Sequence, residues 1–218
     1  MKRSIGVRAL ISALAVVVLA APGSAAQAAS YAIVPERSEL VVRTFKAGIA
    51  SALAHDHVAR ATRFSGTVEY DPASPATASV EVAVEAASVV IDEPELRQRY
   101  EVGKAVSEKD RAKIQETMEG PEQLDVTRFA DIAFRSTRVR PAADGGLEIV
   151  GDFTLHGVTR KVRLPARVEL DGTTLRAHGS FRFLQSDYGI EPFSGGLGTV
   201  RNQDEVELTI RLEARATT

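Results

Sequence analysis

The sequence predicts an all-β fold: a single antiparallel barrel of about eight strands with one helical insertion. Two observations predict the strands. Long segments alternate between apolar and polar residues, and short turn-forming sequences separate these segments. One stretch alone has helical spacing. Strict alternation is typical of strands with one dry and one wet face, which antiparallel sheets allow and all-parallel sheets do not.

The alternation is clearest in the second half of the chain. Val162, Leu164, Ala166, Val168 and Leu170, for example, are separated by polar residues except at Pro165. Similar patterns occupy residues 64–70, 80–85, 147–155, 175–183 and 205–213, and weaker ones occupy 39–45, 54–60 and 131–139. So many strands with one apolar face each must close into a barrel or pack as two sheets.

The connections favour neighbouring strands joined by hairpins. His156-Gly157 and Asp171-Gly172 each separate two alternating segments by a length suited to a tight turn. From Asp131 onward the chain is therefore predicted to run as a meander.

Residues 92–120 are predicted to form a mostly polar helical insertion. Ser107 can cap a helix in which Ile114 and Met118 share a face, and Gly120-Pro121 ends it. A shorter helix is expected to begin near Asp92. We expect the insertion to cover an end or a seam of the barrel.

Residues 1–28 have the features of a secretory signal peptide. A positive start is followed by a short apolar run and by Ala26-Gln27-Ala28, an A-x-A cleavage pattern. The apolar run is broken by Pro22-Gly23 and is shorter than the roughly 20 residues of a spanning helix. We therefore expect residues 29–218 to form one exported domain with no membrane span after cleavage.

Charge and cysteine content exclude several classes of function. The chain carries a net charge of −2, and residues 1–28 contribute three basic and no acidic residues. The remainder is therefore acidic, and nucleic-acid binding normally requires a basic surface. The sequence contains no cysteine, so thiol catalysis and Cys-ligated metal sites are excluded.

The predicted dry faces carry many aromatic residues, together with Gly66, Gly151 and Gly179. Small barrels are either filled by their own side chains or hollow enough for one ligand, and the pattern does not choose between these. Glycine within a strand marks curvature or a close approach. If the barrel is hollow, the candidate cavity residues are Phe45, Phe64, Tyr70, Val82, Phe134, Phe153, Phe181, Phe183, Leu208 and Ile210.

The segment His55-Asp56-His57 is the densest polar group in the sequence. On a strand both imidazoles would face one side, and with His178 they would supply three zinc ligands. Local hydrogen bonding in a loop is the favoured alternative, so we expect no metal. The chain has no G-x-S-x-G sequence either, and we assign no catalytic residue.

Basic residues gather near the first strands. Arg43 and Arg60 lie where a barrel rim is expected, and guanidinium groups suit phosphate recognition. A solvated basic patch is the favoured alternative. As a hypothesis, Arg43, Arg60, His55 and His57 bind the polar head of a ligand.

Four segments resemble motifs of the YceI-like family. Residues 128–136 (RFADIAFRS) are similar to its R-F-P-x-I-x-F-x-S stretch, and residues 151–160 (GDFTLHGVTR) to its G-x-L-T-L-H-G-V-T-R/K hairpin. Ser186-Asp187-Tyr188-Gly189-Ile190 resembles its S/R-x-D-F/Y-G-I segment, and Phe64-Ser65-Gly66 its early F-x-G. Ala130 replaces the usual Pro, and the insertion around residues 97–123 and the His55-Asp56-His57 segment depart from shorter members.

The resemblance implies an extended, lipocalin-like barrel in the bacterial periplasm that encloses a long isoprenoid chain, without enzyme activity. It leaves the identity of the lipid open, and a homodimer is also left open. We carry two alternatives forward. One is an envelope stress or structural protein with a filled barrel, and the other is a metal-dependent enzyme that uses His55 and His57.

Overall fold

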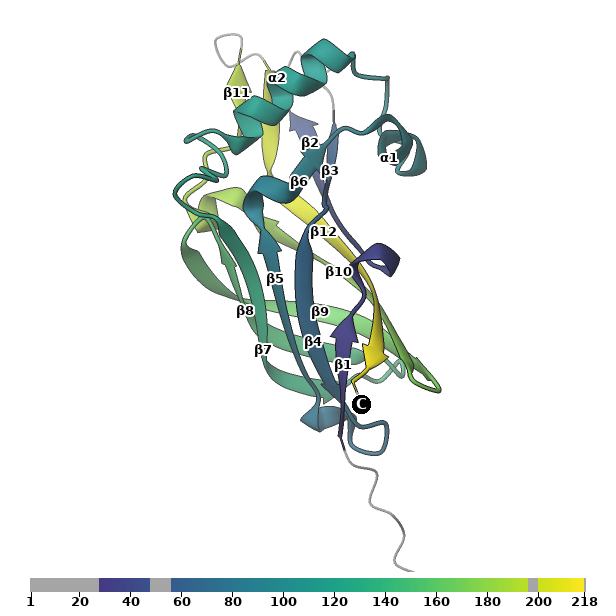
Figure 1. Ribbon diagram of the computed structural model, residues 1–218. Helices are drawn as coiled ribbons and strands as arrows, with labels where there is room; N and C mark the ends of the chain where they lie inside the picture. The colour runs from purple at the N-terminus through teal and green to yellow at the C-terminus, as the bar shows by residue number, and fades with distance from the viewer. Residues whose placement is uncertain (1–27, 48–55, 196–199, 218) are drawn as a thin grey trace, which may run out of the picture.

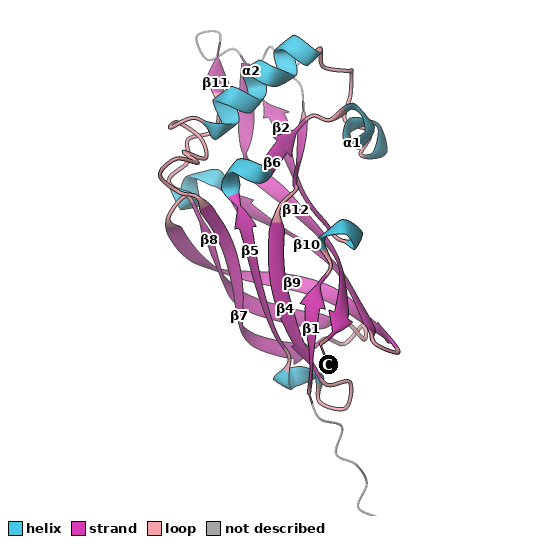
Figure 2. Ribbon diagram, viewed as in Figure 1, coloured by secondary structure: helices cyan, strands magenta, loops and turns pink. Residues whose placement is uncertain are grey.

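The part of the chain that the structure describes forms an extended β-barrel with both of its α-helices at one end (Figures 1 and 2). The computed structural model describes residues 28–47, 56–195 and 200–217. The strands are β1 (Ala29–Ile33), β2 (Glu39–Ala47), β3 (His57–Ala61), β4 (Phe64–Tyr70), β5 (Ser79–Glu85), β6 (Val89–Ile91), β7 (Asp131–Pro141), β8 (Leu147–Leu155), β9 (Val158–Asp171), β10 (Thr174–Leu184), β11 (Ser194–Gly195) and β12 (Val200–Ala216). The helices are α1 (Pro94–Arg99) and α2 (Glu108–Glu119), with short 3-10 turns η1 (Pro35–Arg37), η2 (Pro75–Thr77), η3 (Ala86–Ser88) and η4 (Gln185–Tyr188).

The barrel is a closed antiparallel meander of eight strands. The order is β1-β4-β5-β7-β8-β9-β10-β12, and β12 closes the ring by pairing with β1. The strands β2, β3 and β6 continue the wall toward the helical end, because β2 pairs with β12 and β3, and β3 pairs with β6. Three long strands are therefore each interrupted once, as β1/β2, β3/β4 and β5/β6. This confirms the predicted barrel and strand number.

The three interruptions are joined to their neighbours by hydrogen bonds. The backbone N–H of Thr62 donates to the carbonyl of Ser88, and the Ser88 hydroxyl donates to the carbonyl of Arg63. At η1, the backbone N–H of Val34 donates to the carbonyl of Glu213 in β12. The wall is thus bent at these points without losing its connection to the adjacent strands.

The β8–β9 connection is the predicted tight hairpin. Leu155 pairs with Val158, which leaves a loop of two residues, His156 and Gly157, with φ of 51° and 72°. Positive φ at both central positions is the requirement of a type I′ turn, whose twist matches the flanking strands. The ring of Phe129 also packs against Gly157, where a Cβ would come within 2.5 Å of the Phe129 Cε1 atom.

The helical insertion begins and ends as predicted. The Ser107 hydroxyl accepts a hydrogen bond from the backbone N–H of Asp110, and α2 ends before Gly120. The second helix, α1, begins two residues after Asp92. Both helices lie at the end of the barrel away from β1 and the last residues of β12 (Figure 2), which confirms that the insertion covers one end.

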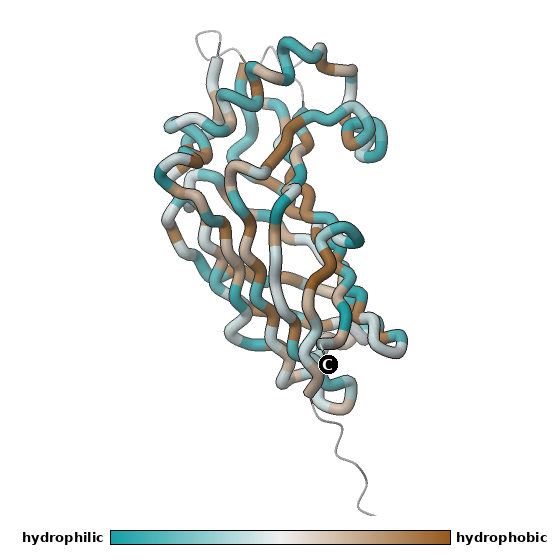
Figure 3. Tube along the Cα trace, in the orientation of Figure 1, coloured by the Kyte–Doolittle hydropathy of each residue, from teal (hydrophilic) through white to brown (hydrophobic). Residues whose placement is uncertain are grey.

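Inward and outward residues alternate along most strands, which Figure 3 shows as a change of hydropathy from residue to residue. The pattern is most regular in β8, where alternate residues from Leu147 to Leu155 are buried. Strand β2 is different, because Leu40, Val41 and Val42 are all apolar. Val41 faces outward and is buried against Val58 and Leu96 of α1.

The predicted signal peptide lies almost entirely outside the described residues, which begin at residue 28. Within the described part of the chain, no helix has the length and apolar character needed to cross a membrane.

Candidate functional site: an apolar cavity with a polar mouth

The barrel encloses a cavity of about 390 Å³. Its walls come from the inward residues of nearly every long strand, and most of them are aliphatic or aromatic. Ligand pockets commonly measure about 300–1,000 Å³ and are lined mainly by apolar side chains with a few polar groups. The cavity therefore has the size and lining of a site for an apolar ligand.

Eight of the ten predicted cavity residues line this space: Tyr70, Val82, Phe134, Phe153, Phe181, Phe183, Leu208 and Ile210. The rings of Phe153 and Phe181 meet edge to face with centroids 5.6 Å apart, an arrangement typical of a packed aromatic wall. Whether these residues bind a ligand stays a prediction.

The other two predicted cavity residues lie elsewhere. Phe64 lies on the inward face of β4, as predicted, but it is buried in the core cluster that includes Tyr31 and Ile33 and does not line the cavity. Phe45 faces outward, where the guanidinium groups of Arg43 and Arg182 lie 5.3 Å and 5.8 Å from its ring centroid. The placement of Phe45 on the dry face was wrong. Both faces of β2 carry apolar residues, so alternation alone could not show which face, and therefore whether Phe45, points into the barrel.

The strand glycines provide room for neighbouring side chains. A Cβ on Gly151 would lie 2.4 Å from Cζ of Phe134, and one on Gly66 would lie 2.7 Å from Cδ1 of Ile33. Neither glycine is among the cavity-lining residues. Gly179, by contrast, does line the cavity, and the choice between a cavity and curvature that the sequence left open is not decided by Gly66 and Gly151.

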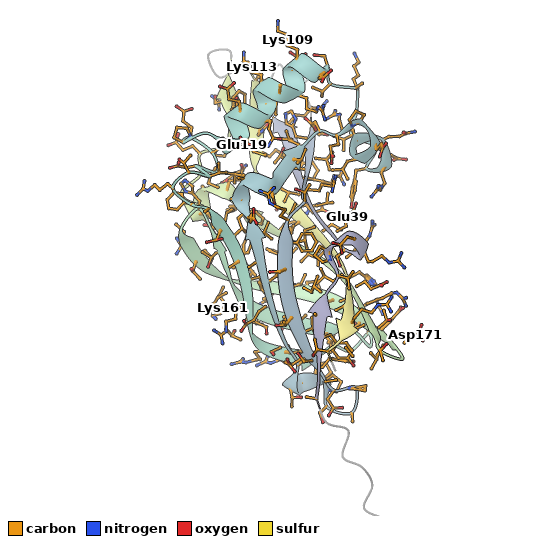
Figure 4. The ribbon with its side chains drawn as sticks, viewed as in Figure 1. Glu39, Lys109, Lys113, Glu119, Lys161 and Asp171 are labelled. Carbon is orange, nitrogen blue, oxygen red and sulfur yellow. The ribbon has the colours of Figure 1, made fainter. Side chains whose placement is uncertain are left out.

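Helix α2 covers the mouth of the cavity. Ile114, Thr117 and Met118 contribute to the cavity lining, followed by Gln123 and Leu124 after the helix. Figure 4 shows α2 across this end, with Lys109 and Lys113 labelled on it, whereas Lys161 and Asp171 lie on the body of the barrel. The helix therefore forms part of the site as well as a cover.

Gln115 joins α2 to the edge of the barrel wall. Strand β6 ends the strand order, so one of its edges has no strand partner in the described sheet. The Gln115 side chain accepts a hydrogen bond from the backbone N–H of Ile91 (3.0 Å) and donates one to the carbonyl of Val89 (2.8 Å). A side-chain amide thus takes the place of a neighbouring strand, since it offers the same donor and acceptor. Sequence reasoning did not find this role.

His57 lines the cavity at the mouth and is fixed by a buried carboxylate. Its Nδ1 atom lies 2.6 Å from Oδ2 of Asp92, whose side chain is 0% exposed. Asp92 also accepts hydrogen bonds from the backbone N–H of Val58 (3.2 Å) and from the Arg97 guanidinium (2.5 Å). Thr44, the register partner of His57 on β2, lines the same part of the cavity.

Arg97 ties this group to the surrounding backbone. Its guanidinium donates to the carbonyls of Asp56, Val102 and Lys104, and the side chain is 4% exposed. Burial alone would raise the pKa of Asp92, but the hydrogen bonds from His57, Val58 and Arg97 outweigh it and hold that pKa below its ordinary value. Asp92 is therefore an ion-paired carboxylate inside the fold.

The predicted polar-head residues do not all gather at the cavity. Arg60 faces outward and makes an ion pair with Glu93, with Nε 2.5 Å from the Glu93 carboxylate, and Arg43 lies over Phe45. Neither arginine is among the cavity-lining residues, while His57 is. His55 lies outside the described residues.

The zinc hypothesis gains no support from the described residues. Nowhere in residues 28–47, 56–195 and 200–217 do three or more His, Asp or Glu side chains form a group that could hold a metal ion. His57 is engaged with Asp92, and His178 is exposed on β10. Asp92 and Arg97, which sequence reasoning did not single out, are the charged groups that the fold brings to His57.

A closed eight-stranded antiparallel barrel around an apolar cavity defines the class: a hollow, lipocalin-like β-barrel protein. Residues 31–214 match the YceI-like domain. The chain is 31% identical over 208 residues to a UPF0312 protein of Shewanella putrefaciens and equally to one of Shewanella baltica, covering 92% of this chain and 95% of each relative. The protein belongs to the YceI-like family.

Solved structures with the same fold include BcnA of Burkholderia cenocepacia, with a TM-score of 0.63 and 18% identity over 83% of this chain and 98% of that one. A Campylobacter jejuni YCEI protein gives a TM-score of 0.54 and 16% identity, covering 73% of this chain and 85% of that one. At these identities the likeness extends to the fold.

Proposed function

We propose that this protein is a non-catalytic periplasmic carrier that holds a long isoprenoid-type lipid in its barrel. The observation that supports this most directly is the apolar cavity of about 390 Å³, covered at its mouth by α2. Membership of the YceI-like family and the barrel fold support polyisoprenoid binding at the level of the family.

The physical basis of such binding is burial of apolar surface. Removing hydrocarbon from water contributes about 25 cal/mol per Å², from which the costs of association are subtracted. A flexible prenyl chain suits an elongated aliphatic and aromatic wall because it needs no polar partner along its length. A filled structural barrel, the main alternative, is less well supported because the enclosed space is lined rather than filled by side chains.

The direct test is to identify what the protein carries. The full chain would be produced in a bacterium with its first 28 residues intact, recovered from the periplasm and extracted with organic solvent for mass spectrometry. We expect a prenyl-chain lipid in stoichiometric amount. Cytoplasmic retention would contradict the proposed location, and a folded protein without any lipid that also fails to bind an added prenyl chain would contradict the carrier function.

A matched pair of substitutions controls this test. Ala177 lines the cavity on β10, whereas Ala83 is exposed on β5. Ala177→Phe should fill part of the cavity and reduce lipid content severalfold, while Ala83→Phe should leave it unchanged. Equal lipid content in both variants would place the lipid outside the barrel.

A further inference from the structure

Two of the polar residues that line the cavity stand side by side at its mouth. Thr44 and His57 are directly paired across β2 and β3, and both line the cavity. Residues directly opposite one another on adjacent strands have Cβ atoms about 5 Å apart. A single small group of a ligand can therefore contact both side chains.

The Thr44 hydroxyl is available for such a contact. Its Oγ1 atom is buried and has no hydrogen-bond partner among the described residues. An unsatisfied buried polar group costs about 1–3 kcal/mol, so buried hydroxyls normally have partners. A polar group on a bound ligand would supply the missing one.

The orientation of His57 decides which ligand chemistry fits. The Asp92 carboxylate accepts from Nδ1, so Nδ1 carries the proton. In the neutral imidazole this leaves Nε2 as an acceptor without a proton. The Arg97 guanidinium, 2.5 Å from the other Asp92 oxygen, supplies a fixed positive charge to the same carboxylate.

From this geometry we infer that the mouth of the cavity is a head-group site for a hydroxyl, which donates to Nε2 of His57 and accepts from the hydroxyl of Thr44. The inference deepens the proposed carrier function and rests on it. An alcohol satisfies both residues at once. A carbonyl or ether oxygen can accept from Thr44 but cannot donate to His57, and a phosphate would bring negative charge toward the acceptor nitrogen.

The charges around the cavity are consistent with a neutral head. Among the cavity-lining residues that the structure describes, Lys113 is the one lysine or arginine, and it is exposed on α2. Phosphate recognition typically uses arginine or several convergent donors. Arg43 and Arg60 lie on the same strands as Thr44 and His57, but their side chains face outward, where they contact Phe45 and Glu93.

The test uses three probes with one chain: geranylgeraniol, its methyl ether and geranylgeranyl phosphate. Their affinities for the full-length protein stripped of lipid would be compared by displacement of a fluorescent apolar dye. We expect the alcohol to bind about tenfold more tightly than the ether, the usual effect of one unmade buried hydrogen bond. We also expect the phosphate to bind more weakly than the alcohol.

Two substitutions assign the effect to the site. His57→Phe and Thr44→Val should each reduce the preference for the alcohol while the ether still binds, and Thr67→Val, on an exposed position of β4, should leave the preference intact. Thr44→Val keeps the side-chain shape, so it remains informative if His57→Phe fails to fold.

Each outcome separates the head-group site from the carrier function. Equal binding of alcohol and ether, or a preference that survives both substitutions, overturns the head-group site and leaves the carrier intact. Tightest binding of the phosphate overturns the choice of a neutral hydroxyl. Failure of all three probes to bind contradicts the carrier function itself.

Discussion

The two ends of the barrel are held together by different kinds of interaction. In the body of the barrel, away from α1 and α2, apolar side chains from facing strands pack against one another, with Leu175 and Ala214 fully buried. At the mouth, the helical insertion is joined to the wall both by apolar contacts and by polar side chains that bond to backbone groups of the wall, such as Gln115 and Arg97. Global stability and access to the cavity can therefore depend on separate residues.

The largest effect is expected in the body of the barrel. Leu175→Ala should lower the free energy of unfolding by about 3 kcal/mol, because a fully buried side chain is replaced by a cavity. Denaturant unfolding would measure this loss, and Leu170→Ala, at a position 36% exposed, is the control. If the two variants lost equal stability, packing in the body would not be what holds the barrel together.

At the mouth, Arg97→Ala is expected to lower the free energy of unfolding by an amount similar to, or slightly smaller than, the loss in Leu175→Ala. Removing one partner of a buried ion pair typically costs about 3 kcal/mol, because the remaining charge is uncompensated. Arg135→Ala, at an exposed pair with Glu81, should cost well under about 1 kcal/mol.

The Arg97→Ala substitution should loosen the mouth before the body of the barrel. Hydrogen exchange should increase first in α1 and at the Val58 amide, which donates to Asp92, and later in β8 and β9. Uniform loss of protection along the chain would mean that the two ends unfold as one unit.

Gln115→Ala isolates the connection between α2 and the wall. We expect a loss of about 1 kcal/mol, the usual net worth of a hydrogen bond, together with faster exchange of the Ile91 amide. Dye should also enter the cavity faster, because α2 loses its attachment to β6. Glu116→Ala, at an exposed position on the same helix, is the control, and an unchanged Ile91 exchange rate in Gln115→Ala would show that this contact does not hold the helix in place.

The smallest effect at neutral pH is expected for Tyr188→Phe. Tyr188 is 1% exposed, and its hydroxyl has no hydrogen-bond partner in the described part of the chain, so its removal should change stability by less than about 1 kcal/mol. Burial and the nearby Asp187 carboxylate raise the pKa of Tyr188 to about 12. Because the pKa of Tyr188 is higher in the folded state than in the unfolded state, a protonated phenol favours folding. This contribution to the free energy of unfolding is complete below the unfolded pKa near 10 and is lost as pH rises through about 12.

Alkaline titration followed by phenolate absorbance checks this assignment. In the wild-type protein Tyr188 should stay largely protonated near pH 11 and ionise in a late step as the barrel unfolds, and Tyr188→Phe should lose that step. Burial and Glu39 also raise the pKa of Tyr100, so Tyr100→Phe is the control that identifies its share of the late absorbance. If the late step persisted in the Tyr188→Phe variant, the raised pKa would belong to another tyrosine.

The body of the barrel could be predicted from sequence because one local rule governs it. Alternation in residues 147–155 and 162–170 requires one face of each strand to be buried, and the turn at His156-Gly157 fixes the register between them. The limits of α2 also followed from local signals, the Ser107 cap and Gly120.

The mouth could not be predicted in the same way, because its residues act on partners far away in sequence. Asp92 contacts His57 across 35 positions, and Gln115 reaches Ile91 across 24. Strand β2 was misread at Phe45 because α1 buries a second face of it, so apolar residues no longer indicate the interior. Single-sequence patterns carry no information about such covering contacts.

The three interruptions in the wall, at η1, at Thr62–Arg63 and at η3, lie on neighbouring strands and bond to one another or to β12. They therefore form one line along which the wall changes direction. The strands β2, β3 and β6 lie on one side of this line and the ring of eight strands on the other, and β12 runs through both because it pairs with β2 as well as with β10 and β1. The outline of the opening and the closure of the ring are thus set by different strand pairs that meet along β12.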